Sequence, residues 1–242
     1  MADASFDADV AQARGVYQTL GPWIDRYHGG IPVGFLAAAI SHESGGNFNA
    51  SGDILLGEVG YLQVAAYVPP LFGYAAEARN DPESNIAIGV LEYELEAALW
   101  ALSTPQVSLG SADNWKLARL AFAVGRSGSR QLANAAASSV GLPQGDVFGA
   151  IRRYVQVSGG IPLGSQSADK VAARVLSIDR QWDIGQAVAF GIPGPPMYIP
   201  DPPAGPYVIP PEVAPYFVKP ISGILLLAAG GAVLTYLLLR RA

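Results

Sequence analysis

The acidic residue Glu43 lies where an otherwise apolar stretch, residues 31–40, runs into a glycine-rich loop. Leu36, Ile40 and Glu43 are spaced i, i+4 and i+7, which places the carboxyl on one helical stripe with two apolar side chains. Because that stripe faces the core, the carboxyl is partly removed from water, and its neutral, proton-donating form is favoured. General acid catalysis requires such an acid at the edge of a cleft. The alternative is an exposed glutamate in the last helical turn.

The loop after Glu43 favours a ligand site. It begins with Ser44, Gly45, Gly46 and Asn47, and glycines let the backbone turn sharply and approach a ligand closely. A second glycine break, residues 57–60, precedes the sequence Tyr-Leu-Gln-Val. The loop therefore favours the interpretation of Glu43 as a catalytic acid over that of an exposed glutamate.

Helical periodicity and helix breakers predict an all-α domain that positions these residues. The sequence Asp81-Pro82-Glu83 combines a capping residue, a proline suited to the first turn and an early acid. No convincing alternating strand pattern is present. The helices are predicted at residues 8–27, 32–44, 63–76, 82–102, 113–124, 128–138, 144–156 and 167–188.

Composition excludes several functional classes. The net charge is −5 and no basic cluster precedes the C-terminus, which argues against binding to nucleic acid. There is no cysteine and there are only two histidines, His28 and His42, so neither a thiolate site nor a histidine-rich metal site is expected. We expect no cofactor and no metal. The acidic first residues do not form a secretory signal peptide.

Three regions differ in composition. Residues 1–191 form the predicted helical domain, and residues 192–220 contain eleven prolines, which predict an extended linker with a reach of up to about 90 Å. Residues 221–239 are uncharged and almost entirely apolar, and Arg240 and Arg241 follow. As one helix this segment would span roughly 28 Å, so we predict a C-terminal transmembrane helix that contacts lipid. The alternative is a buried core helix.

Several short motifs resemble the soluble lytic transglycosylase family, which is similar to goose-type lysozymes. The pieces are Glu43-Ser44, then residues 60–63 (Gly-Tyr-Leu-Gln) and residues 85–89 (Asn-Ile-Ala-Ile-Gly). Residues 121–125 (Ala-Phe-Ala-Val-Gly) and 153–155 (Arg-Tyr-Val) follow in the family's order. The resemblance covers residues 30–157, about half of the chain.

The resemblance implies a lysozyme-like fold that cleaves the bond between N-acetylmuramic acid and N-acetylglucosamine in peptidoglycan. Glu43 would protonate the glycosidic oxygen and then take the proton of the C6 hydroxyl, which closes a 1,6-anhydro ring. No metal is implied. The residues expected to bind substrate are Ser44, Ser51, Tyr61, Gln63, Phe122 and Tyr154. Ser44 would orient Glu43 or cap the local backbone, whereas Phe122 and Trp115 are also good candidates for the core.

The departures from the family pattern leave two alternatives open. Phe122-Ala123 replaces the family's Tyr-Asn pair, which removes a hydroxyl and an amide from the expected cleft. One alternative is an inactive, membrane-anchored assembly or glycan-binding protein. The other is a muramidase that hydrolyses the same bond with water, with Asp53 or Glu58 as its second carboxylate. His42, about 100° around the helix from Glu43, is expected at the surface.

The layout also implies a location. A peptidoglycan-cleaving domain must reach the cell wall, and membrane-containing bacteriophages carry transglycosylases of similar layout. We therefore expect a virion protein, anchored in an internal viral membrane or inserted into the host envelope during genome entry, with its catalytic domain facing the periplasm. Other virion membrane proteins are possible partners. A cellular tail-anchored enzyme that faces the periplasm is the competing hypothesis.

Overall fold

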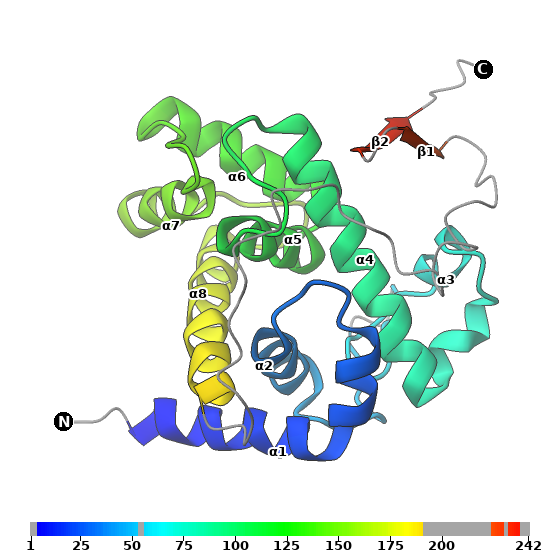
Figure 1. Cartoon of the computed structure of the whole chain (residues 1–242). Coiled ribbons are helices and arrows are strands. Elements are labelled where there is room, and N and C mark those ends of the chain that lie inside the picture. Colours follow the sequence, from blue (N-terminus) through cyan, green and yellow to red (C-terminus); the bar gives the residue numbers. More distant parts are fainter. Residues whose placement is uncertain (1–3, 53–55, 191–223, 230–231, 238–242) are drawn as a thin grey trace.

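The structure is a computed structural model that describes residues 4–52, 56–190, 224–229 and 232–237 (Figure 1). The described residues are mostly helical, as predicted. The elements are α1 (Ala4–Tyr27), α2 (Val33–Ser44), α3 (Val68–Leu71), a 3-10 helix η1 (Ala76–Asn80), α4 (Pro82–Ser103), α5 (Ala112–Val124), α6 (Arg126–Ser139), α7 (Val147–Ser158), α8 (Ala168–Phe190) and the strands β1 (Ile224–Ala229) and β2 (Ala232–Leu237).

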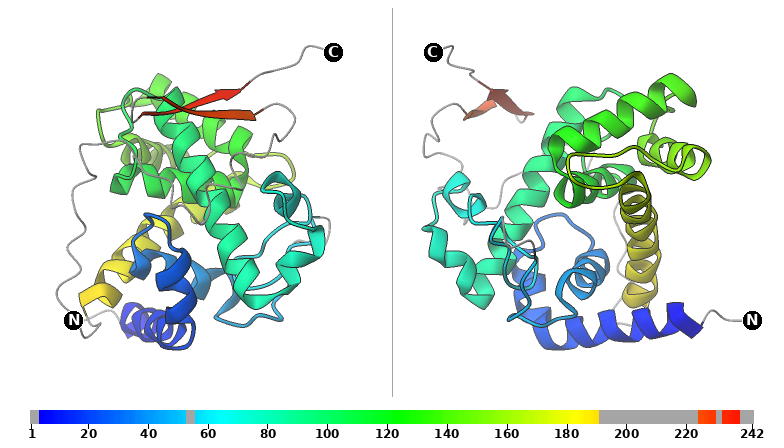
Figure 2. Two further views of the ribbon diagram at one scale, coloured as in Figure 1. Left: turned by 45° about the vertical axis from the view of Figure 1, so that its right-hand side comes forward. Right: turned by 180° about the vertical axis from the view of Figure 1, so that it is seen from behind.

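Helix α2 lies at the centre of the helical domain. It packs against α1 on one side and α8 on the other, and α5 packs against α4, α6 and α8 (Figures 1 and 2). All eight residues from Val33 to Ile40 are buried. A helix that is apolar on every side is stable only inside a core, so this composition fixes the central place of α2.

The close contact between α2 and α8 depends on two glycines. A Cβ added at Gly34 would lie 2.1 Å from the carbonyl oxygen of Gly185. A Cβ added at Gly185 would lie 2.6 Å from the backbone nitrogen of Phe35. Because both obstacles are backbone atoms, the two helices can approach this closely only without side chains at these positions. Trp182 of α8 packs inward, with its ring centroid 5.0 Å from that of Phe35 of α2.

Short capping contacts define where the middle helices begin. The Asp81 carboxylate accepts a hydrogen bond from the backbone nitrogen of Ser84 at 2.9 Å, which confirms the predicted start of α4. The hydroxyl of Ser111 caps α5 in the same way. Asp113 in turn accepts from the backbone nitrogens of Val147 and Phe148 at 3.0 and 2.7 Å, so a side chain of α5 caps α7.

The helix predicted over residues 63–76 is wrong. Only Val68–Leu71 is α-helical there, and the 3-10 helix η1 follows after an interruption. The reason lies in Pro69 and Pro70, which remove two backbone donors, and in Gly73, whose φ of 79° is left-handed. The segment between α2 and α4 is consequently a long folded loop that crosses the surface beside Glu43.

The single helix predicted over residues 221–239 is also not found. The described part of this segment consists of β1 and β2, which pair antiparallel with Ala229 opposite Ala232. An apolar run interrupted by a Gly-Gly dipeptide suits a strand pair as well as a helix, and periodicity alone does not distinguish them. No helix within the described ranges is long and apolar enough to cross a membrane. The proline-rich segment 192–220 lies outside the described residues.

Candidate active site

The end of α2 brings Glu43 to the surface of the core. After the buried residues 33–40, the helix continues with Ser41, His42, Glu43 and Ser44, and Gly45 ends it in a left-handed conformation with φ 63°. The Glu43 side chain is 21% exposed. The carboxyl is therefore held by a largely buried helix, at the point where that helix meets solvent.

The carboxylate of Glu43 forms an ion pair with Arg119 of α5. Nη2 of Arg119 donates to Oε1 of Glu43, whereas Oε2 makes no hydrogen bond with the described residues. The expectation of apolar surroundings is thus only partly correct, because a cation contacts one oxygen. Oε2 is therefore the oxygen that remains unbonded among the described residues.

Arg119 is an internal cation. Its side chain is 2% exposed, and its Nε donates to Oε1 of Gln181 on α8 at 3.0 Å. Its Nη1 is buried without a hydrogen-bond partner among the described residues. Although burial opposes charge, the carboxylate of Glu43 raises the pKa of Arg119 above its ordinary value. The Glu43–Arg119–Gln181 chain therefore joins α2, α5 and α8 through polar contacts.

Glu43 lines a small polar pocket with a volume of about 120 Å³. The walls come from the end of α2, the loop before α3, and from α5 and α8. The lining residues are His42, Glu43, Glu58, Gln63, Arg119, Phe122, Ala123, Arg174 and Ser177. The pocket thus brings together three predicted residues, Glu43, Gln63 and Phe122, with one carboxylate of the hydrolytic alternative, Glu58.

Gln63 is held in the pocket wall by its own loop. Its φ of 53° is left-handed, which is uncommon for a residue other than glycine. Nε2 donates to the carbonyl oxygens of Gly60 and Ala50 at 2.6 and 3.1 Å. Oε1 is buried and makes no hydrogen bond within the described chain. An acceptor left unpaired in a pocket wall is suited to a donor that arrives with a ligand.

Gly52 allows Gln63 and Glu58 to pack together. A Cβ at this position would lie 2.4 Å from Oε1 of Gln63 and 2.5 Å from Oε2 of Glu58. The absence of a side chain at Gly52 therefore brings an amide and a carboxylate to the same place in the loop. Asp53, the other candidate for a second carboxylate, lies outside the described residues.

Asn85 of α4 fixes the loop that carries Gln63. Its Oδ1 accepts from the backbone nitrogen of Leu62 at 3.1 Å, and its Nδ2 donates to the carbonyl oxygens of Val59 and Arg79 at 3.0 and 2.9 Å. Gly89, one turn further along, makes room for Leu62, since a Cβ there would lie 2.5 Å from Cδ1 of Leu62. The motifs at 60–63 and 85–89 are thus direct neighbours in the structure.

Of the predicted substrate-binding residues, Ser44, Ser51, Tyr61 and Tyr154 are not among those that line the Glu43 pocket. Ser44 caps the helix: its hydroxyl donates to the carbonyl oxygen of Ile40 at 3.1 Å and accepts from the backbone of Gly46 at 3.3 Å. This is the capping role anticipated as one of its two possibilities.

The three other predicted residues have different surroundings. Tyr61 packs against Phe48 with ring centroids 5.2 Å apart, and burial raises the pKa of its hydroxyl. Ser51 is exposed, and Tyr154 is half-buried on α7. These residues lie outside the pocket wall, whereas Phe122 lines the pocket and also stacks on buried Tyr93 at 4.8 Å. Trp115 is 3% exposed and belongs to the core.

His42 is exposed, as predicted, but it is also part of the pocket wall. Desolvation on that wall, followed by the charge of Arg119, lowers the pKa of His42 below its ordinary value. Sequence reasoning missed Arg119. A lone arginine inside the apolar run 117–124 is a signal for a buried partner, but nothing in the sequence shows that the partner is Glu43, on a different helix.

No known protein family, curated protein or solved structure matches this chain. Among the described residues, no group of three or more histidine, cysteine or acidic side chains is placed to hold a metal ion.

Proposed function

We propose that this protein is a lytic transglycosylase that cleaves the glycan strands of peptidoglycan. The observation that carries the proposal is the position of Glu43, which lines a pocket together with the buried residue Gln63. The contact between the motifs at 60–63 and 85–89 supports it, because these motifs carry the resemblance to that family. A lysozyme-like arrangement of the helical domain is part of the proposal.

The mechanism requires the protonated form of Glu43, with the proton on Oε2 while Oε1 keeps its contact with Arg119. This proton passes to the glycosidic oxygen between N-acetylmuramic acid and N-acetylglucosamine as the bond from C1 to that oxygen breaks. The C6 hydroxyl of the muramic acid then attacks C1, and its proton returns to Glu43. The product has a 1,6-anhydro ring, and the enzyme ends in its starting protonation state. Arg119 holds Oε1 in place, which leaves Oε2 oriented toward the bond.

The hydrolytic alternative has one specific observation in its favour. Glu58 lines the same pocket as Glu43, so a second carboxylate is available to activate a water molecule. Mass spectrometry of digested sacculi distinguishes the two reactions, because an anhydro end is lighter by one water than a reducing end. We expect the anhydro product.

The assignment of Glu43 is tested by a zymogram with peptidoglycan in the gel. We expect clearing by the wild type and at least a hundredfold loss of activity in Glu43→Gln, the usual effect of losing a general acid. The matched control is Glu77→Gln, an exposed glutamate of η1, which should clear like the wild type. Clearing by Glu43→Gln, or no clearing by the folded wild type, contradicts the proposal. The latter result would favour a non-catalytic glycan-binding protein.

The proposal includes a location at a membrane. Residues 221–239 carry no charged side chain, and this composition supports contact with lipid. This composition and the proline-rich segment together support the proposal that a bacteriophage particle uses the protein to open the host cell wall during genome entry. Detection of the protein in purified virions tests this part of the proposal, and its presence only in uninfected bacterial membranes contradicts it.

A further inference from the structure

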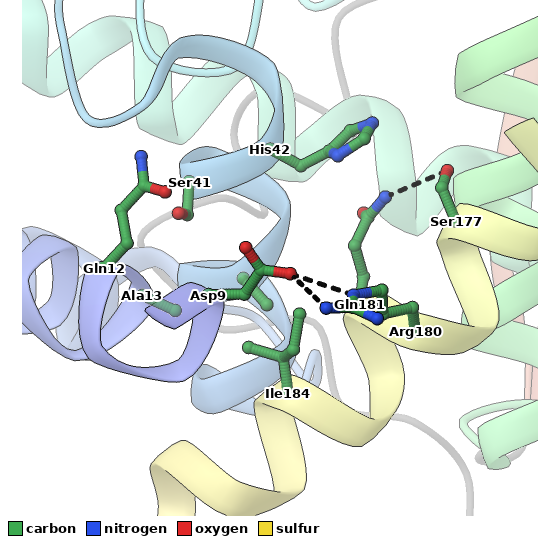
Figure 3. A pocket seen from close by; sticks show the side chains of 10 residues that line it. Asp9, Gln12, Ala13, Ser41, His42, Ser177, Arg180, Gln181 and Ile184 are labelled. Carbon is green, nitrogen blue, oxygen red and sulfur yellow. Dashed lines mark hydrogen bonds and ion pairs between the residues drawn. The ribbon is translucent and has the colours of Figure 1, made fainter. Parts of the chain in front are cut away.

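A second, larger pocket lies next to the first, between α1, α2 and α8. Its volume is about 300 Å³, at the lower end of the range for small-ligand sites. Figure 3 shows its lining, which consists of Asp9, Gln12, Ala13, Ala38, Ser41, His42, Ser177, Arg180, Gln181 and Ile184. His42 and Ser177 also line the Glu43 pocket, so the two pockets share a wall.

The larger pocket has a polar rim and an apolar floor. Ala13, Ala38 and Ile184 form the floor and are at most 7% exposed. On the rim, Nε and Nη2 of Arg180 both lie 2.8 Å from Oδ2 of Asp9 (Figure 3). Oδ1 of Asp9 makes no hydrogen bond with the described residues. Nη2 of Arg180 also donates to Oγ of Ser5 at 2.8 Å, so Asp9 and Ser5 already hold this guanidinium. The pocket therefore offers the second oxygen of Asp9 above a small apolar surface.

This chemistry fits a short peptide better than a sugar. An amino group of a peptide complements the second carboxylate oxygen of Asp9 in charge, whereas a neutral sugar does not. Among the described residues that line the pocket, none is phenylalanine, tyrosine or tryptophan, so no large aromatic face is present for a sugar ring. The alanine floor accepts small side chains such as a methyl group.

We propose that this pocket binds the peptide stem that branches from the muramic acid held at Glu43. The inference rests on the proposed function, because it takes the glycan strand to lie in the Glu43 pocket. The stem crosses the shared wall at His42 and Ser177 and places an amino group at Asp9. The site then distinguishes peptide-bearing glycan strands from bare ones.

The test compares cleavage of whole sacculi with cleavage of glycan strands from which an amidase has removed the peptides. For the full-length wild type we expect peptide-bearing strands to be cleaved about tenfold faster, the effect of one charge-assisted hydrogen bond. In the double variant Asp9→Asn, Arg180→Gln this ratio should fall to about two or less. The exposed pair Arg153–Asp146, on and beside α7, has similar exposure, so Arg153→Gln is the matched control and should keep the wild-type ratio.

A binding measurement separates this inference from the proposed function. Calorimetry with a synthetic muramyl pentapeptide should show binding to the wild type and about tenfold weaker binding to the double variant. Equal cleavage of both substrates by the wild type overturns the inference and leaves the proposed function standing. Binding of the pentapeptide without cleavage of either substrate overturns the proposed function and supports the pocket. Equal binding by wild type and double variant overturns the inference.

Discussion

At the scale of single residues, the pairing of Glu43 with Arg119 has consequences for stability as well as for chemistry. The carboxylate of Glu43 neutralises the guanidinium of Arg119, whose side chain is 2% exposed. Removal of one partner of a buried pair leaves an uncompensated charge, which destabilises a protein more than loss of the pair as a whole.

We therefore expect strong coupling between the two positions. Glu43→Gln and Arg119→Met should each lower the free energy of unfolding by about 1–3 kcal/mol, and the double variant should lose less than the sum. Urea unfolding of the four proteins measures the coupling energy, which we expect to be about 1–2 kcal/mol. The exposed pair Arg153–Asp146 serves as the control, with an expected coupling of less than about 1 kcal/mol. Additive losses at Glu43 and Arg119 would show that the pair is not coupled.

Glu92 carries a second prediction at this scale. It lies half-buried on α4, and burial, followed by the charges of Glu96 and Glu58, raises its pKa to about 8 despite the opposing charge of Arg126. The ordinary value is 4.5, so between pH 4.5 and 8 the unfolded chain gives up a proton that the folded chain keeps. The contribution of Glu92 to the free energy of unfolding is therefore retained below pH 4.5 and is lost as the pH rises from 4.5 to 8.

The variant Glu92→Gln should remove this dependence. Relative to the wild type, it should gain stability steadily from pH 5 to 8, by about 1–3 kcal/mol at the upper end. Chemical denaturation at a series of pH values measures the difference. Glu77→Gln, at an exposed site, should give a constant difference over the same range. A constant difference for Glu92→Gln would contradict the assigned environment.

At the scale of elements, the contact between α2 and α8 is the most sensitive to substitution. Gly185→Ala would place a Cβ 2.6 Å from the backbone nitrogen of Phe35, so the helices must separate. We expect a loss of about 1–3 kcal/mol, measured by thermal and urea unfolding. Gly15→Ala in α1 is the control, because no atom lies within 4 Å of an added Cβ there, and it should gain up to about 1 kcal/mol. Equal effects at both positions would rule out the close contact.

Most helices could be predicted from the sequence because local signals mark their ends. Asp81 with Pro82 and Ser111 start α4 and α5 through contacts within a few residues, and Gly45 ends α2. The segment 63–76 could not be placed in this way. Pro69, Pro70 and Gly73 show that one long helix is interrupted, but they do not show where the chain goes. The loop just before the segment is fixed by Asn85, whose side chain bonds to Leu62 and Val59 from another helix.

The candidate site could be predicted only in part for the same reason. Glu43 and Gln63 carry signals in their own neighbourhoods, a polar residue on an apolar stripe and a glycine-rich loop. Arg119 lies 76 positions away from Glu43, so their contact exists only after α2 and α5 have packed. The larger pocket is likewise built from α1, α2 and α8 and has no continuous sequence motif.

At the scale of the whole molecule, the buried side chains of the helical domain lie within residues 10–188. We therefore expect a chain that ends at Phe190 to fold, with a melting temperature within about 3 °C of the full-length value. The full-length protein should float with lipid vesicles in a density gradient, and the shortened chain should remain at the bottom. Circular dichroism of the shortened chain is the control for folding. Flotation of both proteins, or of neither, would argue against lipid contact by residues 221–239.

The ion pair between Glu43 and Arg119 also limits how this sequence can change during evolution. A lineage that no longer needs the acid cannot exchange it freely, because the stranded guanidinium penalises every uncharged replacement. The substitutions expected to be tolerated replace both residues at nearly the same time by apolar side chains that fit the hydrophobic core. Relatives that have lost the proposed activity should therefore be recognised by a paired exchange at positions 43 and 119.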